Sequence, residues 1–340
     1  MDILIKSFNR PFYLDRCIAS ILKNVKGNFR ITVLDDGTQE KYLVKLKEKY
    51  PETAFRLSSQ AEEKRKAIDE NLKNGTPIDG FKIPTDLWKN AVAEAEKYVL
   101  VTEDDVWFTK EIHIDSVVDE MEKFNIPLVK LGWLGMKNDE SFCKIQKLSE
   151  NLTEVTPKNL FTAGKTVMDW FMYNKYKFYT ILYKLGFVDN QTKEKYWSIN
   201  SILMGLYDKN YWLAIWEDAA GKVDEKQQLR NAAAWFHKNK KAVFAQSSEE
   251  VMKTTFKSSA TGSYHEYGNH FDVNRFNFII NEAWYIGDFD AMENYPKDFS
   301  DSYFKQFLDK ENHPDAQFSE WFLWAEKFRN QYKNIGAETE

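Results

Sequence analysis

The segment Tyr98–Asp105 constrains the fold more than any other part of the chain. Its first five residues, Tyr-Val-Leu-Val-Thr, favour a buried β-strand that runs directly into Glu103, Asp104 and Asp105. Open α/β sheets place their ligands at the carboxyl ends of strands. Three adjacent carboxylates repel one another unless a positive charge lies among them. The segment therefore predicts an α/β fold with a hard cation, Mg²⁺ or Mn²⁺, that bridges to a phosphorylated ligand at this strand end.

Composition places the chain among globular proteins. It has 340 residues, of which 43% are hydrophobic, and this is enough for one large domain with an appendage. The net charge of −5 and the lack of a long basic run argue against nucleic acid as the main partner. Cys17 and Cys143 are too few for a disulfide framework and suit a reducing compartment. We expect a cytoplasmic protein, because a strand is predicted from Asp2 where a signal peptide would lie, and no stretch is apolar enough to cross a bilayer.

Strand and helix patterns alternate over the first hundred residues. Apolar runs predict strands at 3–5, 31–34, 54–57 and 98–101. The spacing of apolar residues predicts helices at 11–27, 42–46, 60–73 and 85–95, the last of them capped by Thr85 or Asp86. This alternation favours a mostly parallel sheet with helices on both faces. The polar loops after Ile5, Leu34 and Val101 would then lie along one edge, where a nucleotide can bind.

Three motifs at the predicted strand ends have the order and spacing of a known family. They are Lys-Ser-Phe-Asn-Arg10, Asp-Asp-Gly-Thr38 and Glu-Asp-Asp105. Together they resemble GT-A-fold glycosyltransferases, with closest similarity to the inverting family 2 enzymes, and the resemblance covers about residues 1–135. It implies a GT-A (Rossmann-like) α/β fold, a nucleotide-sugar donor that is most simply a UDP-hexose, and Mn²⁺ or Mg²⁺ as cofactor.

The resemblance also implies which residues bind the donor. Ser7 and Phe8 would line the base, and Asp36 would accept a hydrogen bond from it. Arg10 would lie near the phosphates. The other donor-binding residues that it implies are Asp35, Lys89, Glu103 and Asp104.

One of these assignments departs from the family pattern, and another has a purely structural alternative. Lys89 stands where the family has an arginine, which keeps the charge but loses the bidentate fork. Asp35 and Asp36 could instead form only a turn closed by Gly37. For the metal, the resemblance implies Asp105 as a ligand and His265 on the metal or the diphosphate.

An inverting transfer needs a carboxylate that takes the proton from the acceptor hydroxyl. Asp224 and Glu225 open a predicted helix over 224–235, and a basic turn and a short strand near 244 follow. This layout is similar to that of the base in the family, and it assigns Glu225 as the base with Asp224 beside it. The pair could also serve only as favourable charge in the first turn of the helix. The alternative bases are Asp169, Glu217 and Asp218.

The second half of the chain is expected to form the binding site for the acceptor. We divide the chain into a catalytic domain at 1–265 and a C-terminal extension at 266–340, rich in helix and aromatic residues. Within the catalytic domain, 1–135 is the nucleotide-sugar half and 136–265 is the acceptor half. Residues 160–165 and the aromatic run after them resemble a strand and loop beneath an acceptor pocket, and a helix through 178–182 is closed by Gly186.

The extension has one clear helical pattern. Residues 274–284 fit either a strand or a helix. An amphipathic terminal helix docked on the catalytic domain is predicted by Phe318, Trp321, Phe322, Ala325 and Phe328. If this stripe were exposed, it could instead touch a membrane that carries a lipid-linked acceptor.

These features indicate a metal-dependent glycosyltransferase that moves a hexose from a nucleotide diphosphate to a glycan or lipid-linked glycan. The expected setting is surface polysaccharide assembly, in the cytoplasm or at the inner face of the membrane. A retaining transferase on the same fold and a catalytically silent carbohydrate-binding protein remain alternatives. A nucleotidyltransferase is disfavoured, because its Gly-rich phosphate loop with an arginine near the N-terminus is absent.

Overall fold

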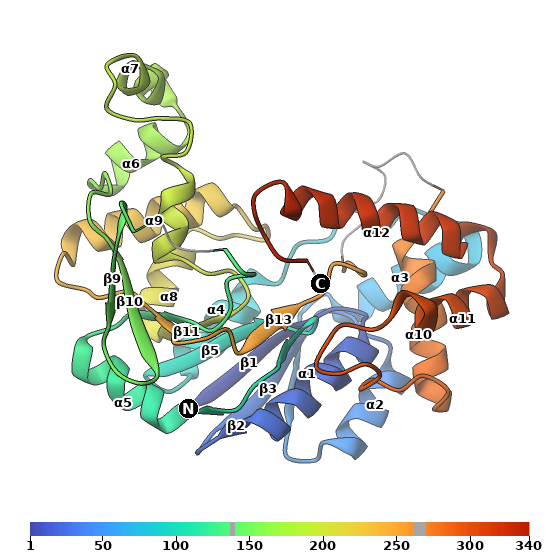
Figure 1. Cartoon of the computed structure of the whole chain (residues 1–340). Coiled ribbons are helices and arrows are strands. Elements are labelled where there is room, and N and C mark those ends of the chain that lie inside the picture. The colour runs from blue at the N-terminus through green and yellow to red at the C-terminus, as the bar shows by residue number, and fades with distance from the viewer. Residues whose placement is uncertain (137–139, 261–269, 340) are drawn as a thin grey trace.

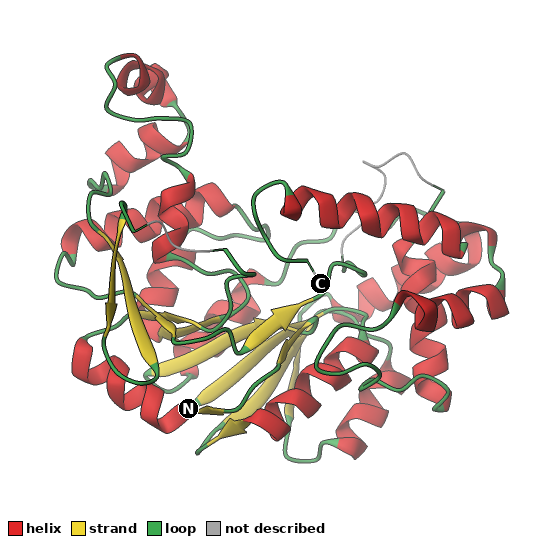
Figure 2. Ribbon diagram, in the orientation of Figure 1, coloured by secondary structure: helices red, strands yellow, loops and turns green. Residues whose placement is uncertain are grey.

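A nine-stranded sheet runs through the centre of the protein, with helices on both faces (Figures 1 and 2). The computed structural model describes residues 1–136, 140–260 and 270–339. In spatial order, the strands are β4 (Ala54–Leu57), β3 (Arg30–Asp35), β1 (Asp2–Ser7), β5 (Tyr98–Glu103), β11 (Gly205–Asp208), β8 (Leu128–Lys130), β12 (Ala245–Ser247), β10 (Leu152–Pro157) and β9 (Cys143–Lys147). Two small ribbons pair β13 (Met252–Thr254) with β6 (Val106–Phe108) and β2 (Val25–Lys26) with β7 (Ile112–His113).

The strands from the first half of the chain are parallel, as predicted. β1 pairs in parallel with both β3 and β5, and β3 pairs in parallel with β4. Antiparallel strands enter with the second half: β11 lies between β5 and β8, while β10 joins β12 to β9. The register places Ser7 opposite Asp35 and Lys6 opposite Glu103. The carboxyl ends of β3, β1 and β5 therefore lie side by side.

Alternating side chains of the strands build a hydrophobic core on each face of the sheet. Ile3 and Ile5 of β1 face one cluster, and Leu4 between them faces the other. The helices are α1 (Pro11–Asn24), α2 (Glu40–Lys49), α3 (Ala61–Asn74), α4 (Thr85–Glu94), α5 (Ile114–Phe124), α6 (Lys165–Met172), α7 (Phe178–Lys184), α8 (Lys209–Trp216), α9 (Glu225–Lys238), α10 (Val273–Ile286), α11 (Asp301–Glu311) and α12 (Phe318–Lys333). Residues of α1, α5, α10, α11 and α12 build the first cluster, and residues of α4, α6, α8 and α9 build the second.

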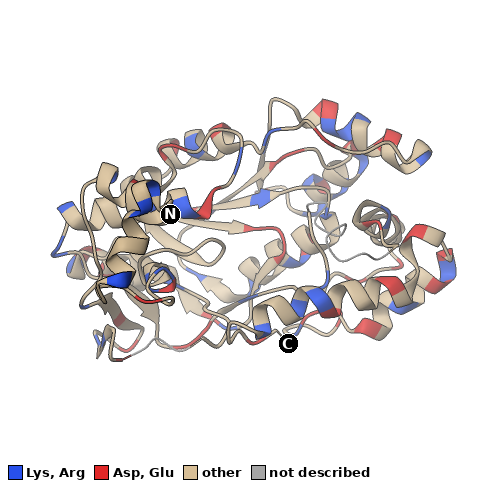
Figure 3. Ribbon diagram, turned by 90° about the horizontal axis from the view of Figure 1, so that it is seen from above, with Lys and Arg blue, Asp and Glu red and all other residues tan. Residues whose placement is uncertain are grey.

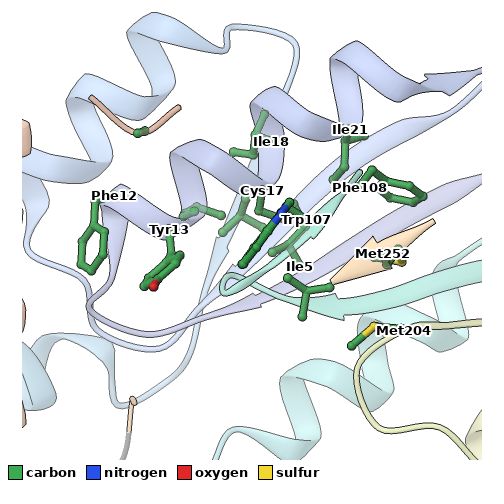
Figure 4. Packing of buried hydrophobic residues seen from close by; sticks show 14 of the residues in the cluster. Ile5, Phe12, Tyr13, Cys17, Ile18, Ile21, Trp107, Phe108, Met204 and Met252 are labelled. Atoms are coloured by element: carbon green, nitrogen blue, oxygen red, sulfur yellow. The ribbon is translucent and has the colours of Figure 1, made fainter. Parts of the chain in front are cut away.

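Helix α1 fixes the loop that follows β1. Pro11 occupies its first turn, as expected, because proline lacks only an amide that the first turn leaves free. Its apolar stripe, including Cys17 and Ile18, packs over Ile5 and Trp107 (Figure 4). The helix ends at Asn24 rather than at Gly27, because the next two residues pair as β2 with β7.

Three local predictions were wrong. Residues 160–164 form a loop rather than a strand, and the aromatic run after them lies in α6. Thr85 is inside α4 and does not cap it; its hydroxyl accepts a hydrogen bond from the amide of Gly221 at 2.8 Å. Asp86 is also inside the helix, and its carboxylate pairs with Lys89 at 3.2 Å. The ambiguous segment 274–284 is helical, as part of α10.

Helix α12 packs on the preceding part of the chain, as predicted: the Trp321 indole donates to the carbonyl of Lys257 at 2.9 Å, and the ring centroids of Phe328 and Phe256 are 6.0 Å apart. Trp321 and Trp324 of α12 are fully buried, and Trp321 stacks on Phe276 of α10 with ring centroids 5.9 Å apart. Of the predicted aromatic stripe, only Phe322 is exposed, at 37%. The stripe therefore faces the protein and does not offer a membrane-binding surface.

Charged residues of both signs are interspersed along the helices (Figure 3). Over the residues that the structure describes, no helix combines the length and apolar character needed to span a bilayer.

Lys130, at the carboxyl end of β8, is a largely buried lysine. Its ammonium donates a hydrogen bond to the carbonyl of Trp197, and within the described ranges no acidic side chain pairs with it. Burial lowers the pKa of Lys130 to about 8. At pH 7 the native protein therefore carries the full cost of burying this charge.

We expect Lys130→Met to raise the free energy of unfolding at pH 7 by about 2 kcal/mol, after allowance for the lost hydrogen bond. The native pKa lies below the unfolded value of about 10.4, so the unfolded state binds more protons between those two values and the wild type gains stability as pH rises. The advantage of the variant should therefore shrink from pH 8 to pH 10. Urea unfolding of both proteins at pH 7 and pH 9.5 measures this. A variant that is less stable at pH 7, or a pH-independent difference, would contradict the account.

Candidate nucleotide-diphosphate site

Main-chain hydrogen bonds join the three loops that follow β1, β3 and β5. The amide of Asp36 donates to the carbonyl of Ser7 at 2.9 Å, and the amide of Asp104 donates to the carbonyl of Lys6 at 2.9 Å. Each bond runs from the end of a neighbouring strand to β1. Polar groups that are up to a hundred residues apart in the sequence are thereby held in one place.

Arg10 lies between the two aspartates of the acidic triplet. Its Nη1 donates to Oδ2 of Asp105 at 2.7 Å and its Nη2 donates to Oδ1 of Asp104, while the side chain is only 4% exposed. Burial alone would lower the pKa of Arg10, but the neighbouring carboxylates of Asp104 and Asp105 outweigh it and raise that pKa. Arg10 is therefore a permanent positive charge inside the site.

Asp104 positions the loop after β1. Its Oδ2 accepts hydrogen bonds from the Ser7 hydroxyl at 3.2 Å and from the Phe8 amide at 3.0 Å, and its Oδ1 is held by Arg10. Burial raises the pKa of Asp104 to about 7; Arg10 opposes this rise and Asp105 adds to it. Since both carboxylate oxygens accept hydrogen bonds, Asp104 mainly holds Ser7, Phe8 and Arg10 in position.

Asp105 has a free buried oxygen. Oδ2 is held by Arg10, but Oδ1 is buried without a hydrogen-bond partner. Burial raises the pKa of Asp105, and Glu103 adds to the rise while Arg10 opposes it. Glu103 itself pairs with Lys6 at 2.6 Å and keeps 29% exposure. Three carboxylates thus share two cations, and Oδ1 of Asp105 is left without a hydrogen-bond partner.

These groups fit an oxygen-liganded divalent cation. Over the described ranges, no group of three or more His, Cys, Asp and Glu side chains forms a closed metal site. Mg²⁺ is usually held by only one or two carboxylates, with water and substrate phosphates as the other ligands, and Mn²⁺ prefers the same kinds of ligand. The free Oδ1 of Asp105 beside Glu103 meets that requirement.

His265 lies outside the described residues, so its assigned role stays a prediction. The chain that leads toward it begins beside the acidic triplet, because the amide of Thr255 donates to the carbonyl of Asp105 at 3.3 Å. Ala260, at the end of this stretch, lines the cavity described below.

The two aspartates after β3 have different roles. Asp35 is fully buried, and its Oδ1 accepts from the amides of Gly37 and Thr38 at 3.0 and 2.9 Å. Asp35 therefore holds the turn, and it does not line the cavity. Asp36 does line it and pairs with Lys64. Burial raises the pKa of Asp36, and Lys64 opposes the rise.

Gly37 is required between these residues. Its φ is +131°, and a Cβ at this position would lie 2.9 Å from Cβ of Lys64. Any larger residue would push α3 away from the turn that presents Asp36.

A cavity of about 620 Å³ opens beside the three strand ends. Ser7, Phe8, Arg10, Asp36, Glu103 and Asp104 are among its lining residues, whereas Asp105 is not. The loop 77–84 and Trp88 of α4 form another part of the wall. The ammonium of Lys64 lies 5.8 Å from the ring centroid of Phe8 and 5.9 Å from that of Phe81. A cavity with aromatic faces and convergent charges can accept a planar base joined to phosphates.

Several lining residues were missed by the sequence analysis. They are Lys6, Lys64, Trp88, Asn274 and the loop 77–84. Lys6 could have been found, because its place at the end of β1 faces the strand that ends in Glu103. Trp88 supports it, with the Lys6 ammonium 4.9 Å from the indole centroid.

Lys89 is not part of the cavity wall. Its ammonium donates to the carbonyl of Ala219 at 2.8 Å and pairs with Asp86. It therefore ties α4 to the segment before α9, and the donor-binding role expected for it finds no support in this geometry.

The segment just before α9 reaches the cavity, since Val223 is in its wall, whereas Asp224 and Glu225 are not among the lining residues. Asp224 caps the helix by accepting from the amide of Gln227 at 3.0 Å, and it also accepts from the Tyr173 hydroxyl at 2.7 Å. Although burial opposes the shift, these hydrogen bonds lower the pKa of Asp224.

Glu225 differs from its neighbour. It is exposed, and no hydrogen bond or ion pair reaches its carboxylate from the residues that the structure describes. Partial desolvation raises the pKa of Glu225, and the nearby charges of Glu194 and Asp224 add to the rise. Of the two, Glu225 has the freer and more basic carboxylate.

The alternative bases belong to an ion-pair network. Arg230 of α9 bridges Asp169 at 2.8 Å and Asp218, while Lys165 pairs with Glu217 and Asp218. Burial opposes the shift, but Lys175 and Arg230 lower the pKa of Asp169. These carboxylates tie α6, α8 and α9 together and are poorly suited to accept a proton.

No family model and no curated protein sequence matches the chain. Solved structures do match it. S. aureus TarS 1–349 in complex with UDP is 13% identical, with 91% of this chain and 71% of that chain covered and a TM-score of 0.41. Glucosyl-3-phosphoglycerate synthase from Mycobacterium tuberculosis in complex with Mn²⁺, UDP and phosphoglyceric acid is 12% identical, with 84% and 78% covered and a TM-score of 0.37. An active-site mutant of LgtC is 13% identical, with 68% and 70% covered and a TM-score of 0.33.

The chain is thus similar to solved glycosyltransferases along most of its length. Identities and TM-scores of this size do not by themselves assign an activity.

Proposed function

We propose that this protein is a metal-dependent glycosyltransferase that uses a nucleotide-diphosphate sugar, with UDP-hexose as the expected donor. The acceptor is a glycan or a lipid-linked glycan, and the transfer inverts the anomeric centre. The observation that carries the proposal is the convergence of Asp36, Arg10, Glu103 and Asp104 around one cavity at the ends of three adjacent strands, with Asp105 held behind them by Arg10.

The cavity supplies contacts for each part of such a donor. Phe8 and Phe81 offer aromatic faces to the base, and Asp36 offers a carboxylate to its polar edge. Lys6 and Arg10 lie beside the acidic triplet, where a diphosphate needs positive charge. The uracil preference follows from the family resemblance and stays a prediction.

Asp105 and Glu103 would hold the divalent cation, with His265 as a further predicted ligand. When bound there, the cation would supply Lewis-acid stabilisation to a departing diphosphate. Arg10 and Lys6 would also attract the negative charge of the diphosphate. Carboxylates already hold both side chains in place in the unliganded protein. With a divalent cation bound, positive charge would exceed the charge of the three carboxylates, and the site would suit an anionic leaving group.

Glu225 is the proposed base. The acceptor hydroxyl forms its new bond to the anomeric carbon while the bond from that carbon to the diphosphate oxygen breaks. Glu225 takes the hydroxyl proton and later returns it to solvent. Its exposed carboxylate without a protein partner suits this role, whereas Asp224 is committed to capping α9 and to Tyr173.

Release of the nucleoside diphosphate tests the proposal. We expect purified protein with Mn²⁺ to release UDP slowly from at least one UDP-sugar even without acceptor, because water can attack in its place. GDP- and CDP-sugars are the controls for the base, and EDTA is the control for the metal. If no donor is hydrolysed while glycans still bind, the protein is a silent carbohydrate-binding protein. An α-linked product from an α-linked donor would indicate a retaining enzyme instead.

A further inference from the structure

A helical arm projects from the body of the protein. We define the α6–α7 arm as residues 173–188, which include α7, and it stands clear of the other elements in Figure 1. None of the residues of α7 is buried. Phe178, Tyr179 and Leu182 turn partly toward the body and pack on the core beneath. The arm is thus anchored on one side and open on the other.

The open side of the arm is apolar. Five large side chains within twelve residues are exposed: Tyr176 (82%), Ile181 (50%), Tyr183 (46%), Leu185 (63%) and Phe187 (74%). Single exposed apolar residues are ordinary, but clusters of this kind mark interaction surfaces. The tip of the arm combines aromatic and branched aliphatic side chains, which insert readily at a lipid interface.

The same arm is basic in an acidic protein. Lys175, Lys177 and Lys184 lie in it, and residues 170–188 contain no Asp or Glu, although the chain has a net charge of −5. Lys175 pairs with Asp169, whereas Lys177 and Lys184 extend from the arm without an ion pair to any described residue. Exposed lysines beside exposed aromatics are complementary to a surface of anionic headgroups over acyl chains.

The backbone holds this surface in an unusual conformation. Asn174, Tyr176 and Lys177 have φ values of 53°, 54° and 57°. Tyrosine and lysine rarely adopt this left-handed region. The turn holds Tyr176 largely in solvent, with its ring edge-to-face against Trp170 at 5.6 Å between centroids.

The arm is also joined to the proposed acceptor side. α6 packs against α9, and Tyr173 at the base of the arm donates its hydroxyl to Asp224 at 2.7 Å. The base of the arm is therefore tied directly to the first turn of α9.

We infer that the α6–α7 arm binds the surface of an anionic lipid bilayer, with its aromatic and aliphatic side chains in the interface and its lysines at the headgroups. α12, whose stripe is buried, does not provide this contact. The inference goes beyond the proposed function, because it requires neither donor nor metal.

Co-sedimentation with vesicles tests the inference in the absence of nucleotide. We expect the full chain to bind vesicles of phosphatidylcholine mixed with phosphatidylglycerol, and to bind phosphatidylcholine alone at least tenfold more weakly. The double variant Lys177→Glu with Lys184→Glu should lose at least tenfold in partitioning to the anionic vesicles. Lys123→Glu with Lys333→Glu, which carries the same charge change on other exposed surfaces, should bind as the wild type does.

A second pair of variants tests the apolar part. Leu185→Ser with Phe187→Ser should also lose at least tenfold. Ile286→Ser with Ile335→Ser, which removes apolar side chains of similar exposure from α10 and the C-terminal end, should not. Wild type that stays in the supernatant, or arm and control variants that bind equally, would overturn the inference. A concentration-dependent dimer that only the arm variants lose, without vesicle binding, would assign the arm to a second copy and would also overturn it. Donor hydrolysis in solution should be unchanged in all four variants, so failure here is distinguishable from failure of the proposed activity.

Discussion

Asp105→Asn is expected to abolish the metal-dependent part of UDP binding without unfolding the protein. The substitution keeps the shape of the side chain and removes the charge that the free Oδ1 would offer to a cation. In a thermal-shift assay, UDP with Mn²⁺ should raise the Tm of the wild type, since a ligand present at a hundred times its Kd stabilises by about 2.7 kcal/mol. The variant should show only the smaller shift that UDP gives alone.

The unliganded variant should remain folded, because Arg10 keeps its pair with Asp104. In the native protein, burial raises the pKa of Asp105, so its charge is held at a cost, and Glu103 adds to that cost. An uncharged asparagine relieves both, and this offsets part of the cost of weakening the pair with Arg10. Asp119→Asn, on an exposed face of α5, is the matched control and should leave both the Tm and the UDP shift unchanged.

The rate of sugar transfer by Asp105→Asn should fall together with its metal-dependent UDP binding. Loss of the cation at the departing diphosphate should lower the rate of transfer about a hundredfold, which corresponds to roughly 3 kcal/mol. If Asp105→Asn keeps the full Mn²⁺-dependent shift, Asp105 is not a metal ligand and the metal part of the account is wrong.

Glu225→Gln is expected to lower kcat by about 10²- to 10⁴-fold while donor affinity stays the same, because a general base contributes this much and touches the acceptor rather than the nucleotide. The carboxylate is exposed and makes no hydrogen bond to the described residues, so the protein should fold normally. The pH profile gives a second readout. The base must be deprotonated, so wild-type kcat should fall as pH drops through the raised pKa of Glu225, and the variant should lose that acid limb.

Asp224→Asn is the comparison variant. Asparagine caps helices as well as aspartate does, so α9 should be retained and any loss of rate would report on chemistry. We expect a much smaller effect than for Glu225→Gln. The reverse order would make Asp224 the base. Full activity in both variants would place the base on another residue.

Much of the donor half could be predicted from local patterns. The apolar runs at 3–5, 31–34 and 98–101 correspond to β1, β3 and β5, because a buried strand must be apolar throughout. Parallel strands with right-handed crossovers then bring their carboxyl ends to one edge, so Ser7, Asp36 and Asp104 follow from the order of elements alone.

Individual side-chain partners could not be predicted in this way. Arg10 lines the cavity as expected, but it pairs with Asp104 and Asp105, a contact across more than ninety residues. Lys89 was placed in the site by motif position, yet its neighbour Trp88 faces the cavity, since one residue turns the side chain by about 100° around a helix. Lys64 and the loop 77–84 carry no pattern of their own, and tertiary packing brings them to the site.

The structure of residues 136–265 was predicted less well, because aromatic residues there lie both in the core and on the surface. The segment around 160–172 is rich in β-formers, but the buried residues Met168, Phe171 and Met172 follow the helical i, i+3, i+4 spacing, and α6 forms. The exposed residues of the α6–α7 arm are of the same types, so sequence composition could not separate core from surface there.

The central claim is that the ends of β1, β3 and β5 form one site for a nucleoside diphosphate and a divalent cation. The most direct measurement is an anomalous-difference map at the manganese edge from crystals grown with UDP and Mn²⁺. We predict a manganese peak about 2.1 Å from Oδ1 of Asp105, with UDP in the cavity beside Phe8 and Asp36. A peak remote from Asp105, or UDP bound elsewhere on the protein, would contradict the account.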